Sequence, residues 1–285
     1  MMFRTILLDV SEGVATITLN RTDKRNAFGD GMGRELAAAY AACDRDDDIR
    51  AVILTGAGSA FCAGADLSAG EDTFVGAGDG FSAAAVSMPA WQVRKPVIAA
   101  VNGHAIGVGL TLALQCDIRL FAEDAKYGVV QVRRGVMGDA HAHWVLPRMV
   151  GIARAAEILL TGATFDGHRA VELGIGSRTL PAEQVYPAAV EIARDIACNT
   201  APLSVAASKA LLWESFGLTV TEVGERETAA HRLLMASADA REGVRAHLEE
   251  RVPVWTDALP LRDGVAAHDP EFAVSKEHRH VEPHH

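Results

Sequence analysis

The strongest constraint on the fold is a strand–turn–helix–strand rhythm in the middle of the chain. Residues 96–101 form an apolar run too short to be a core helix, and a glycine-rich turn follows it. Residues 107–116 have the length and apolar content of a short helix, and 118–122 form another short apolar run. Buried strands that alternate with helices predict an α/β fold with parallel strands.

The N-terminal third adds further elements of both kinds. Residues 5–9 and 14–19 alternate apolar and polar side chains on either side of a Ser-Glu-Gly turn, which predicts a β-hairpin. Residues 32–43 have helical spacing with Asp30 as a possible N-cap, and 51–55 are predicted as a buried strand.

The next segments differ in character from one another. Residues 67–80 are rich in Gly, Ser and Asp and are expected to be mobile, whereas 81–94 are predicted to be helical. Beyond Trp144 the pattern is almost wholly helical, interrupted by one short strand at 177–180. The predicted helices are 153–160, 167–173, 183–197, 202–216, 220–236 and 240–250.

These elements divide the chain into three parts. We expect an α/β core over residues 1–200, a helical C-terminal region over 201–256, and a tail over 257–285. The tail changes in composition and ends in several histidines, so it is expected to be flexible.

Charge and cysteine content restrict the possible partners. The formal net charge of −10 disfavours nucleic acid and anionic membranes, so an anionic ligand would need a local basic patch. The four cysteines are widely spaced, with neither a CxxC motif nor a zinc-type pattern, which is typical of reduced thiols. The start of the chain does not resemble a signal peptide and no apolar run is long enough to span a bilayer, so we expect a cytoplasmic protein.

Two turns rich in small residues offer backbone N–H groups to a ligand. Residues 61–66, Phe-Cys-Ala-Gly-Ala-Asp, and the Gly107–Gly109 turn each allow close approach to the backbone. We predict that the N–H groups of Ala63 and Val108 form an oxyanion hole, which suits chemistry that passes through a thioester enolate. The second turn lacks the third glycine of a dinucleotide-binding fingerprint.

Both stretches, in this order and spacing, resemble the crotonase superfamily, the enoyl-CoA hydratase/isomerase family. The segments 25–28, 116–118, 150–151 and 159–162 also fit, and the resemblance extends from about residue 5 to 250. It implies a crotonase-like spiral of ββα repeats with C-terminal helices that build a homotrimer or a dimer of trimers. It also implies an acyl-CoA substrate, with no metal and no cofactor apart from the CoA carried by the substrate.

The resemblance further implies where the substrate binds. CoA would lie near Lys24, Arg25 and Ala27, and the two basic side chains would supply the local positive charge, although a solvated loop is the alternative. The positions expected to surround the rest of the CoA and the oxyanion turn are Ala65, Asp66, Leu67 and Gly107. Trp91 either lines the acyl pocket or belongs to the core.

Two departures from the family pattern bear on mechanism. Hydratases of this family use two glutamates, and the corresponding positions here are Thr111 and Gln131. An ordinary hydroxyl is not a general base at neutral pH, and an amide cannot carry a proton. The usual acid/base pair is therefore missing.

Asp139 falls where dienoyl-CoA isomerases of this family carry an additional aspartate, so it is the leading acid/base candidate, with His141 as a second. Alternatively, Asp139 is an N-cap of the following helix, and His141 and His143 lie on its face. A metal site formed by these three residues is a further alternative. Arg133 and Arg134 indicate either an acidic or polar acyl group or a solvated surface.

The sequence thus favours an acyl-CoA enzyme that performs isomerase or atypical lyase chemistry with Asp139. One alternative is an enoyl-CoA hydratase whose water is held by Gln131, Thr111 and Asp139. Another is an acyl-CoA-binding protein that has lost catalysis.

Overall fold

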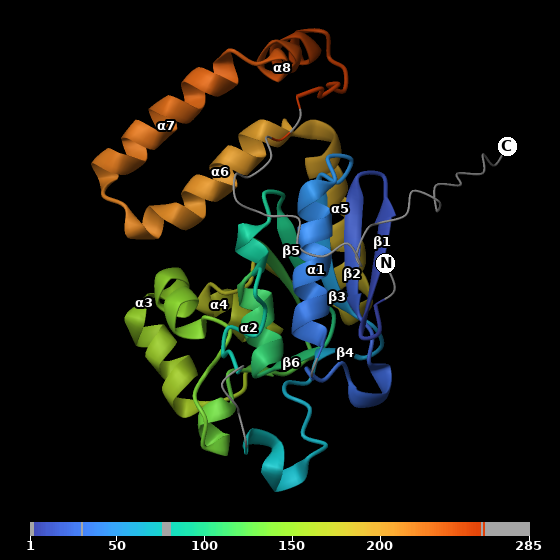
Figure 1. The fold of residues 1–285 in the computed structure, drawn as a ribbon, viewed down its shortest axis with the longest axis vertical. Helices are drawn as coiled ribbons and strands as arrows, with labels where there is room; N and C mark the ends of the chain where they lie inside the picture. The colour runs from blue at the N-terminus through green and yellow to red at the C-terminus, as the bar shows by residue number, and fades with distance from the viewer. Residues whose placement is uncertain (1–2, 30, 76–80, 258, 260–285) are drawn as a thin grey trace, which may run out of the picture.

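The core of the molecule is a six-stranded sheet with one antiparallel edge. A computed structural model describes residues 3–29, 31–75, 81–257 and 259 (Figure 1). The first two strands pair antiparallel, as the predicted hairpin requires, and all later neighbours are parallel. In sheet order the strands are β1 (Ile6–Ser11), β2 (Val14–Leu19), β3 (Ala51–Gly56), β5 (Val97–Val101), β7 (Ile118–Ala122) and β9 (Arg178–Leu180).

A second, smaller parallel sheet was not predicted from the sequence. It consists of β4 (Ala60–Cys62), β6 (His104–Ile106) and β8 (Tyr127–Gly128), in that order. Strands of two or three residues are too short to show an alternating pattern, which explains why they were missed. Each follows a long strand of the first sheet, so the chain winds between the two sheets as a spiral. The α/β, crotonase-like spiral expected from the sequence is therefore present.

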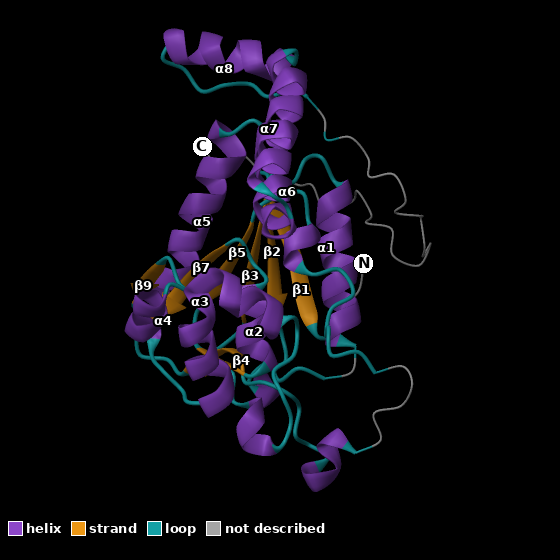
Figure 2. Cartoon of the chain, turned by 90° about the vertical axis from the view of Figure 1, so that its left-hand side faces the viewer, coloured by secondary structure: helices purple, strands orange, loops and turns teal. Residues whose placement is uncertain are grey.

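Helices cover both faces of the large sheet. Figure 2 shows the strands of the large sheet between α5 on one side and α1 on the other, whereas α2 packs against the small sheet. Except for 81–94, each predicted helix is present. The helix predicted over 153–160 is only the C-terminal part of α3, which begins at Ala142, and the other predicted helices agree within a few residues. Asp30 lies outside the described residues, and Gly31 occupies the N-cap of α1. The helices are α1 (Met32–Arg45), α2 (Val108–Leu114), α3 (Ala142–Thr161), α4 (Gly167–Leu173), α5 (Ala182–Asn199), α6 (Pro202–Glu214), α7 (Val220–Met235) and α8 (Ala238–Leu248).

The helix predicted over residues 81–94 was wrong. Only η3 (Ala90–Gln92), a single 3-10 turn, forms there. Ala85 has a left-handed backbone with φ 65°, and Pro89 precedes the turn without a donor N–H, so a continuous helix is interrupted twice. Residues 76–80 of the preceding loop lie outside the described residues, and η2 (Gly70–Phe74) forms within its described part.

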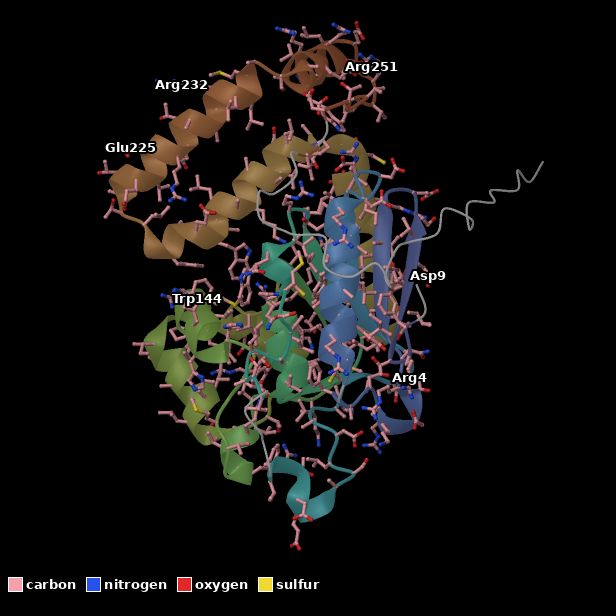
Figure 3. The ribbon with its side chains drawn as sticks, viewed as in Figure 1. Arg4, Asp9, Trp144, Glu225, Arg232 and Arg251 are labelled. Carbon is pink, nitrogen blue, oxygen red and sulfur yellow. The ribbon has the colours of Figure 1, made fainter. Side chains whose placement is uncertain are left out.

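The C-terminal helices α6, α7 and α8 form an arm that extends away from the sheet (Figure 1). A buried ion pair anchors its base, because Lys209 Nζ on α6 lies 2.6 Å from Asp117 Oδ2 beside the start of β5. Asp117 also accepts a hydrogen bond of 2.7 Å from Trp213 Nε1. Trp213 in turn stacks on Trp144 of α3, at 6.1 Å between ring centroids, and Figure 3 shows Trp144 where α3 faces the arm.

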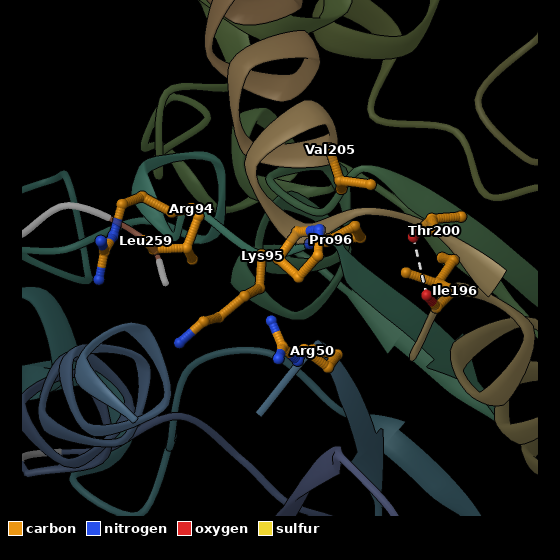
Figure 4. Close-up of a pocket in the computed structure, with 9 residues that line it drawn as sticks. Arg50, Arg94, Lys95, Pro96, Ile196, Thr200, Val205 and Leu259 are labelled. Atoms are coloured by element: carbon orange, nitrogen blue, oxygen red, sulfur yellow. Dashed lines mark hydrogen bonds between the residues drawn. The ribbon is translucent and has the colours of Figure 1, made fainter. Parts of the chain in front are cut away.

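A second buried lysine joins the sheet to α1. Lys95 Nζ donates to the carbonyl oxygens of Cys43, Asp44 and Asp46 at 2.6–2.8 Å, which satisfies the C-terminal end of α1. Burial lowers the pKa of Lys95 to about 8. Lys95 and Thr200 are two of the residues that line a small cavity, and Figure 4 draws these lining residues as sticks. That cavity, of about 10 Å³, holds at most one water molecule and is not a substrate site.

Most of the predicted tail, 257–285, lies outside the described residues; Asp257 and Leu259 are its described members. None of the helices in the described ranges is both long enough and apolar enough to cross a membrane.

Candidate active site

Helix α2 begins at a turn in which the backbone N–H of Val108 has no acceptor among the described residues. Gly107 has φ 56° and ψ −123°, a conformation that favours glycine, and its own N–H donates to the Gly128 carbonyl at 2.8 Å. The N–H of Val108, the first residue of α2, meets no acceptor among the described residues. The sequence-based assignment of Val108 as a donor is consistent with this geometry.

The second predicted donor needs correction. The Ala63 N–H donates to the Arg25 carbonyl at 3.0 Å, so it is already occupied. Ala65, two residues further on, forms a parallel bridge with Phe28 in which the neighbours of Ala65 make the hydrogen bonds. The Ala65 N–H therefore points away from Phe28, and no acceptor for it exists within the described ranges. The two available backbone donors are therefore the N–H groups of Ala65 and Val108, and Ala63 is not one of them.

Close packing brings these two turns together. A Cβ on Gly109 would lie 2.3 Å from the Cys62 carbonyl oxygen, and one on Gly64 would lie 2.9 Å from the Ile106 carbonyl oxygen. Larger residues at either position would push the turns apart. The two glycines thus allow the turn that contains Val108 and the turn that contains Ala65 to pack closely together.

The side chain of Asp139 is held by the two residues that occupy the glutamate positions. Its Oδ1 lies 2.9 Å from Thr111 Oγ1 and 3.1 Å from Gln131 Nε2. Thr111 Oγ1 is also 3.2 Å from the Val108 carbonyl, but its single proton favours the shorter, charged partner. The structure therefore brings together Thr111, Gln131 and Asp139, three of the polar residues that the sequence singled out.

The carboxyl group of Asp139 is partly buried, and its two oxygen atoms have different environments. Burial raises its pKa above the ordinary value, while the hydrogen bonds from Thr111 and Gln131 oppose that rise. Oδ2 accepts no hydrogen bond from the described residues and is not fully enclosed, so it remains available to a ligand. Gln131 Oε1, in contrast, is buried without a hydrogen-bond partner in the described structure and lies beside Gly107.

His141 forms no hydrogen bond with the side chain of Asp139 in the described structure. It occupies the N-cap of α3 with a left-handed backbone, and its ring packs edge-on against Trp91 at 5.1 Å between centroids. The alternative in which the Asp139 side chain caps α3 is thus wrong, because that side chain bonds to Thr111 and Gln131 instead. No group of three potential metal ligands occurs among the described residues, Asp139, His141 and His143 included.

The basic residues near the first turn are tied to Asp66. Arg21 and Lys24 both donate to Asp66 Oδ2, at 2.6 and 2.9 Å. Hydrogen bonds from Ser68, Arg21 and Lys24 hold the pKa of Asp66 well below its usual range. Arg25 is exposed, with a left-handed backbone. Arg21 was not predicted as a site residue, because nothing in the sequence around it shows that its side chain reaches a residue 45 positions later.

The remaining candidate residues have varied environments. Ala27 is buried and its carbonyl accepts from Arg21, whereas Leu67 is half exposed. Trp91 packs against both Trp144 and Trp213, so it belongs to the aromatic cluster at the base of the arm. Arg133 Nε donates to the Thr161 carbonyl at the end of α3, which gives it a helix-capping role.

Comparison with known proteins agrees with this architecture. The chain matches the enoyl-CoA hydratase/isomerase family over residues 9–258 and belongs to that family. A 1,2-epoxyphenylacetyl-CoA isomerase from Escherichia coli strain K12 is 37% identical over 261 residues, which cover 90% of this chain and 99% of the relative. An enoyl-CoA hydratase from Alternaria alternata is 36% identical over 262 residues, covering 89% of this chain and 86% of the relative.

Solved structures show the same fold. A probable enoyl-CoA hydratase/isomerase from Mycobacterium abscessus superposes with a TM-score of 0.86 at 51% identity, covering 88% of this chain and 98% of that one. The protein is accordingly a crotonase-fold enzyme of a family that acts on CoA thioesters.

Replacing Asp139 with asparagine is expected to stabilise the protein at neutral pH. The pKa of Asp139 is raised in the folded state, so its ionised form opposes folding at pH values above the unfolded-state pKa. The asparagine side chain keeps the acceptor for Thr111 and Gln131 without the buried charge. We expect a melting temperature higher by about 2 °C at pH 7, as roughly 1 kcal/mol gives for a large domain.

This advantage of the Asp139→Asn variant should shrink as the pH falls through the folded-state pKa of Asp139, because the wild-type carboxyl is then neutral as well. Thermal unfolding of both proteins between pH 4 and 8 measures this. An unchanged or lower melting temperature for the variant at pH 7 would contradict the assignment of a raised pKa.

Proposed function

We propose that the protein isomerises an acyl-CoA by moving a proton between carbons near the thioester, with Asp139 as its acid/base group. The observation that carries this proposal is that Thr111 and Gln131 both donate to Asp139 Oδ1. The positions that hold catalytic glutamates in hydratases are used here to anchor a third residue. A single carboxylate with one open oxygen replaces a pair.

In this mechanism the N–H groups of Ala65 and Val108 receive the thioester oxygen. Asp139 Oδ2 removes a proton from carbon, and the electron pair of the broken C–H bond passes to the thioester oxygen as an enolate. Two backbone donors stabilise the developing charge, each worth about 3–4 kcal/mol in the transition state. Asp139 then returns the same proton to another carbon of the conjugated system. No atom is gained or lost, so the reaction needs no cofactor besides the CoA of the substrate.

Other features support the same substrate class. Arg25 and Lys24 lie beside the first turn and supply positive charge for the CoA phosphates in a chain of net charge −10. The E. coli relative named as an isomerase supports an isomerisation, although relatives named as hydratases have similar identity. The acyl group itself is not specified by these contacts.

A second candidate function is hydration of an enoyl-CoA. Gln131 Oε1 is a buried acceptor without a partner in the described structure, which is a suitable environment for a water molecule. Such a water would lie beside Gly107, near the oxyanion donors. Asp139 would then have to deprotonate the water and supply a proton to carbon, two tasks that a hydratase divides between two glutamates.

The Asp139→Asn variant distinguishes these functions from a protein without catalysis. We expect a loss of about 10²–10⁴-fold in kcat for the conversion of 3-enoyl-CoA to 2-enoyl-CoA, because asparagine cannot accept the proton. Spectrophotometric assays of isomerisation and of crotonyl-CoA hydration, run on both proteins, measure the two activities. Unchanged isomerase turnover in the variant would remove Asp139 from the mechanism, and dominant hydration in the wild type would favour the second function.

The pH dependence of catalysis should respond to Thr111. If Asp139 acts as the base, kcat/KM rises with pH as the carboxyl group ionises and then levels off. The Thr111 hydroxyl lowers the pKa of that group, so Thr111→Val should move the acidic limb of the profile to higher pH. Gln131→Met should move it in the same direction. A limb that stays in place or moves to lower pH in both variants contradicts this role.

We also propose that the arm assembles copies of the chain into a trimer, alone or as a dimer of trimers. None of the described side chains of α7 is buried, although Leu233 and Met235 are apolar and exposed by 77% and 66%. Apolar surface of this kind is usually covered in an oligomer. Light scattering should give three or six times the chain mass for the wild type and a lower mass for Leu233→Glu. Leu7→Glu, on the distant edge strand β1, is the matched control, and a monomeric wild type contradicts the proposal.

A further inference from the structure

The residues that follow Asp139 adopt a backbone conformation that their side chains do not favour. Ala140 and His141 are both left-handed, with φ 46° and 64°. Non-glycine residues seldom adopt this region, and alanine has no polar side chain to compensate locally. Two such residues in succession next to an acid/base candidate require a set of contacts that hold them.

Those contacts come from two separate parts of the fold. The Ala140 N–H donates to the Ala83 carbonyl at 2.7 Å, and the Ala140 carbonyl accepts from Gln115 Nε2 at 3.2 Å. Ala140 and Gln115 are each only 1% exposed, so water does not compete for these bonds. Within the turn, the Ala142 N–H donates to the Asp139 carbonyl at 2.9 Å.

Gln115 and Thr111 act from the same helix. Thr111 lies in the middle of α2 and Gln115 is its C-cap residue, with a helical backbone, so these side chains four residues apart share one face. Thr111 binds the carboxyl group of Asp139, and Gln115 binds the peptide that follows it. The same helix carries the Val108 N–H at its first turn, so α2 fixes the oxyanion donor and Asp139 relative to each other.

We propose that Gln115 is a positioning residue for catalysis. It holds the left-handed turn at Ala140 and His141 so that the Asp139 carboxyl group stays with Thr111 and Gln131. Gln115 touches no substrate in this scheme and acts through Asp139. The inference rests on the proposed function, in which Asp139 transfers the proton.

The test is the Gln115→Met variant, which keeps the volume of the side chain and removes its donor. We expect kcat for acyl-CoA isomerisation to fall about 10- to 100-fold, as a small misplacement of a catalytic group does, while KM stays within about twofold. Thr200→Val is the matched control, because it also removes a side-chain hydrogen bond to a backbone carbonyl, the one drawn in Figure 4. Its kcat should equal that of the wild type.

A second variant separates positioning from simple loss of stability. Glycine adopts left-handed conformations without the cost that alanine bears, so Ala140→Gly in the Gln115→Met background should recover at least roughly threefold in kcat. A purely structural role of Gln115 predicts no recovery. If Gln115→Met does not fold, Gln115→Asn, whose shorter amide falls short of Ala140, is assayed in its place.

The outcomes also separate this inference from the proposed function. If Asp139→Asn is inactive but the folded Gln115 variant has the kcat of the wild type, the positioning role is overturned and the proposed function stands. If the Gln115 variant loses kcat without recovery in the double variant, the positioning role is likewise overturned. If Asp139→Asn is fully active, the proposed function fails, and the Gln115 inference fails with it.

Discussion

The position of helix α2 depends on one close backbone contact. Gly109 packs against the Cys62 carbonyl so tightly that a single added carbon would lie 2.3 Å from the oxygen. This contact lets the first turn of α2 lie beside the turn after β4, where the Ala65 N–H is open. Everything that α2 carries, from Val108 to Gln115, is placed relative to the second sheet by that packing.

The polar groups of the site are of two kinds: those that position Asp139 by hydrogen bonds, and those that have no partner and remain available to a ligand. Thr111 and Gln131 both direct protons at Asp139 Oδ1, and Gln115 directs one at the next peptide. Within the described part of the chain, the groups without a partner include Asp139 Oδ2 and the N–H groups of Ala65 and Val108. Gln131 belongs to both kinds, because its Nε2 donates to Asp139 while its Oε1 has no hydrogen-bond partner in the described structure. This division underlies both the isomerase proposal and its hydratase alternative.

Much of the fold could be predicted from the sequence, because in long segments the spacing of apolar residues shows which face is buried. The hairpin, the buried strands and the C-terminal helices are of this kind. The second sheet was missed because its strands are too short to show a periodic pattern. The helix predicted over 81–94 was wrong because Ala85 adopts a left-handed conformation, which the neighbouring sequence does not indicate. Tertiary contacts override local propensity at such places.

For the candidate site, residue types were predictable but hydrogen-bond directions were not. The sequence indicated Thr111, Gln131 and Asp139 as one group, and the structure brings them together. It assigned Ala63 as a donor, because a motif shows which amides are near a ligand but not which are already bonded within the chain. The contacts of Arg21 and Gln115 span 45 and 25 residues, so no local signal could reveal them.

The single open oxygen of Asp139 has a stereochemical consequence. An enolate is planar, and one carboxylate oxygen fixed on one side of that plane can reach only one of its faces. On the proposed mechanism the proton therefore leaves and returns on the same face, and a deuterium label on the departing carbon would be carried to the receiving carbon. The face of the enolate that exchanges the proton is then set by the hydrogen bonds from Thr111 and Gln131, which hold Asp139 Oδ1 and leave Oδ2 without a partner among the described residues.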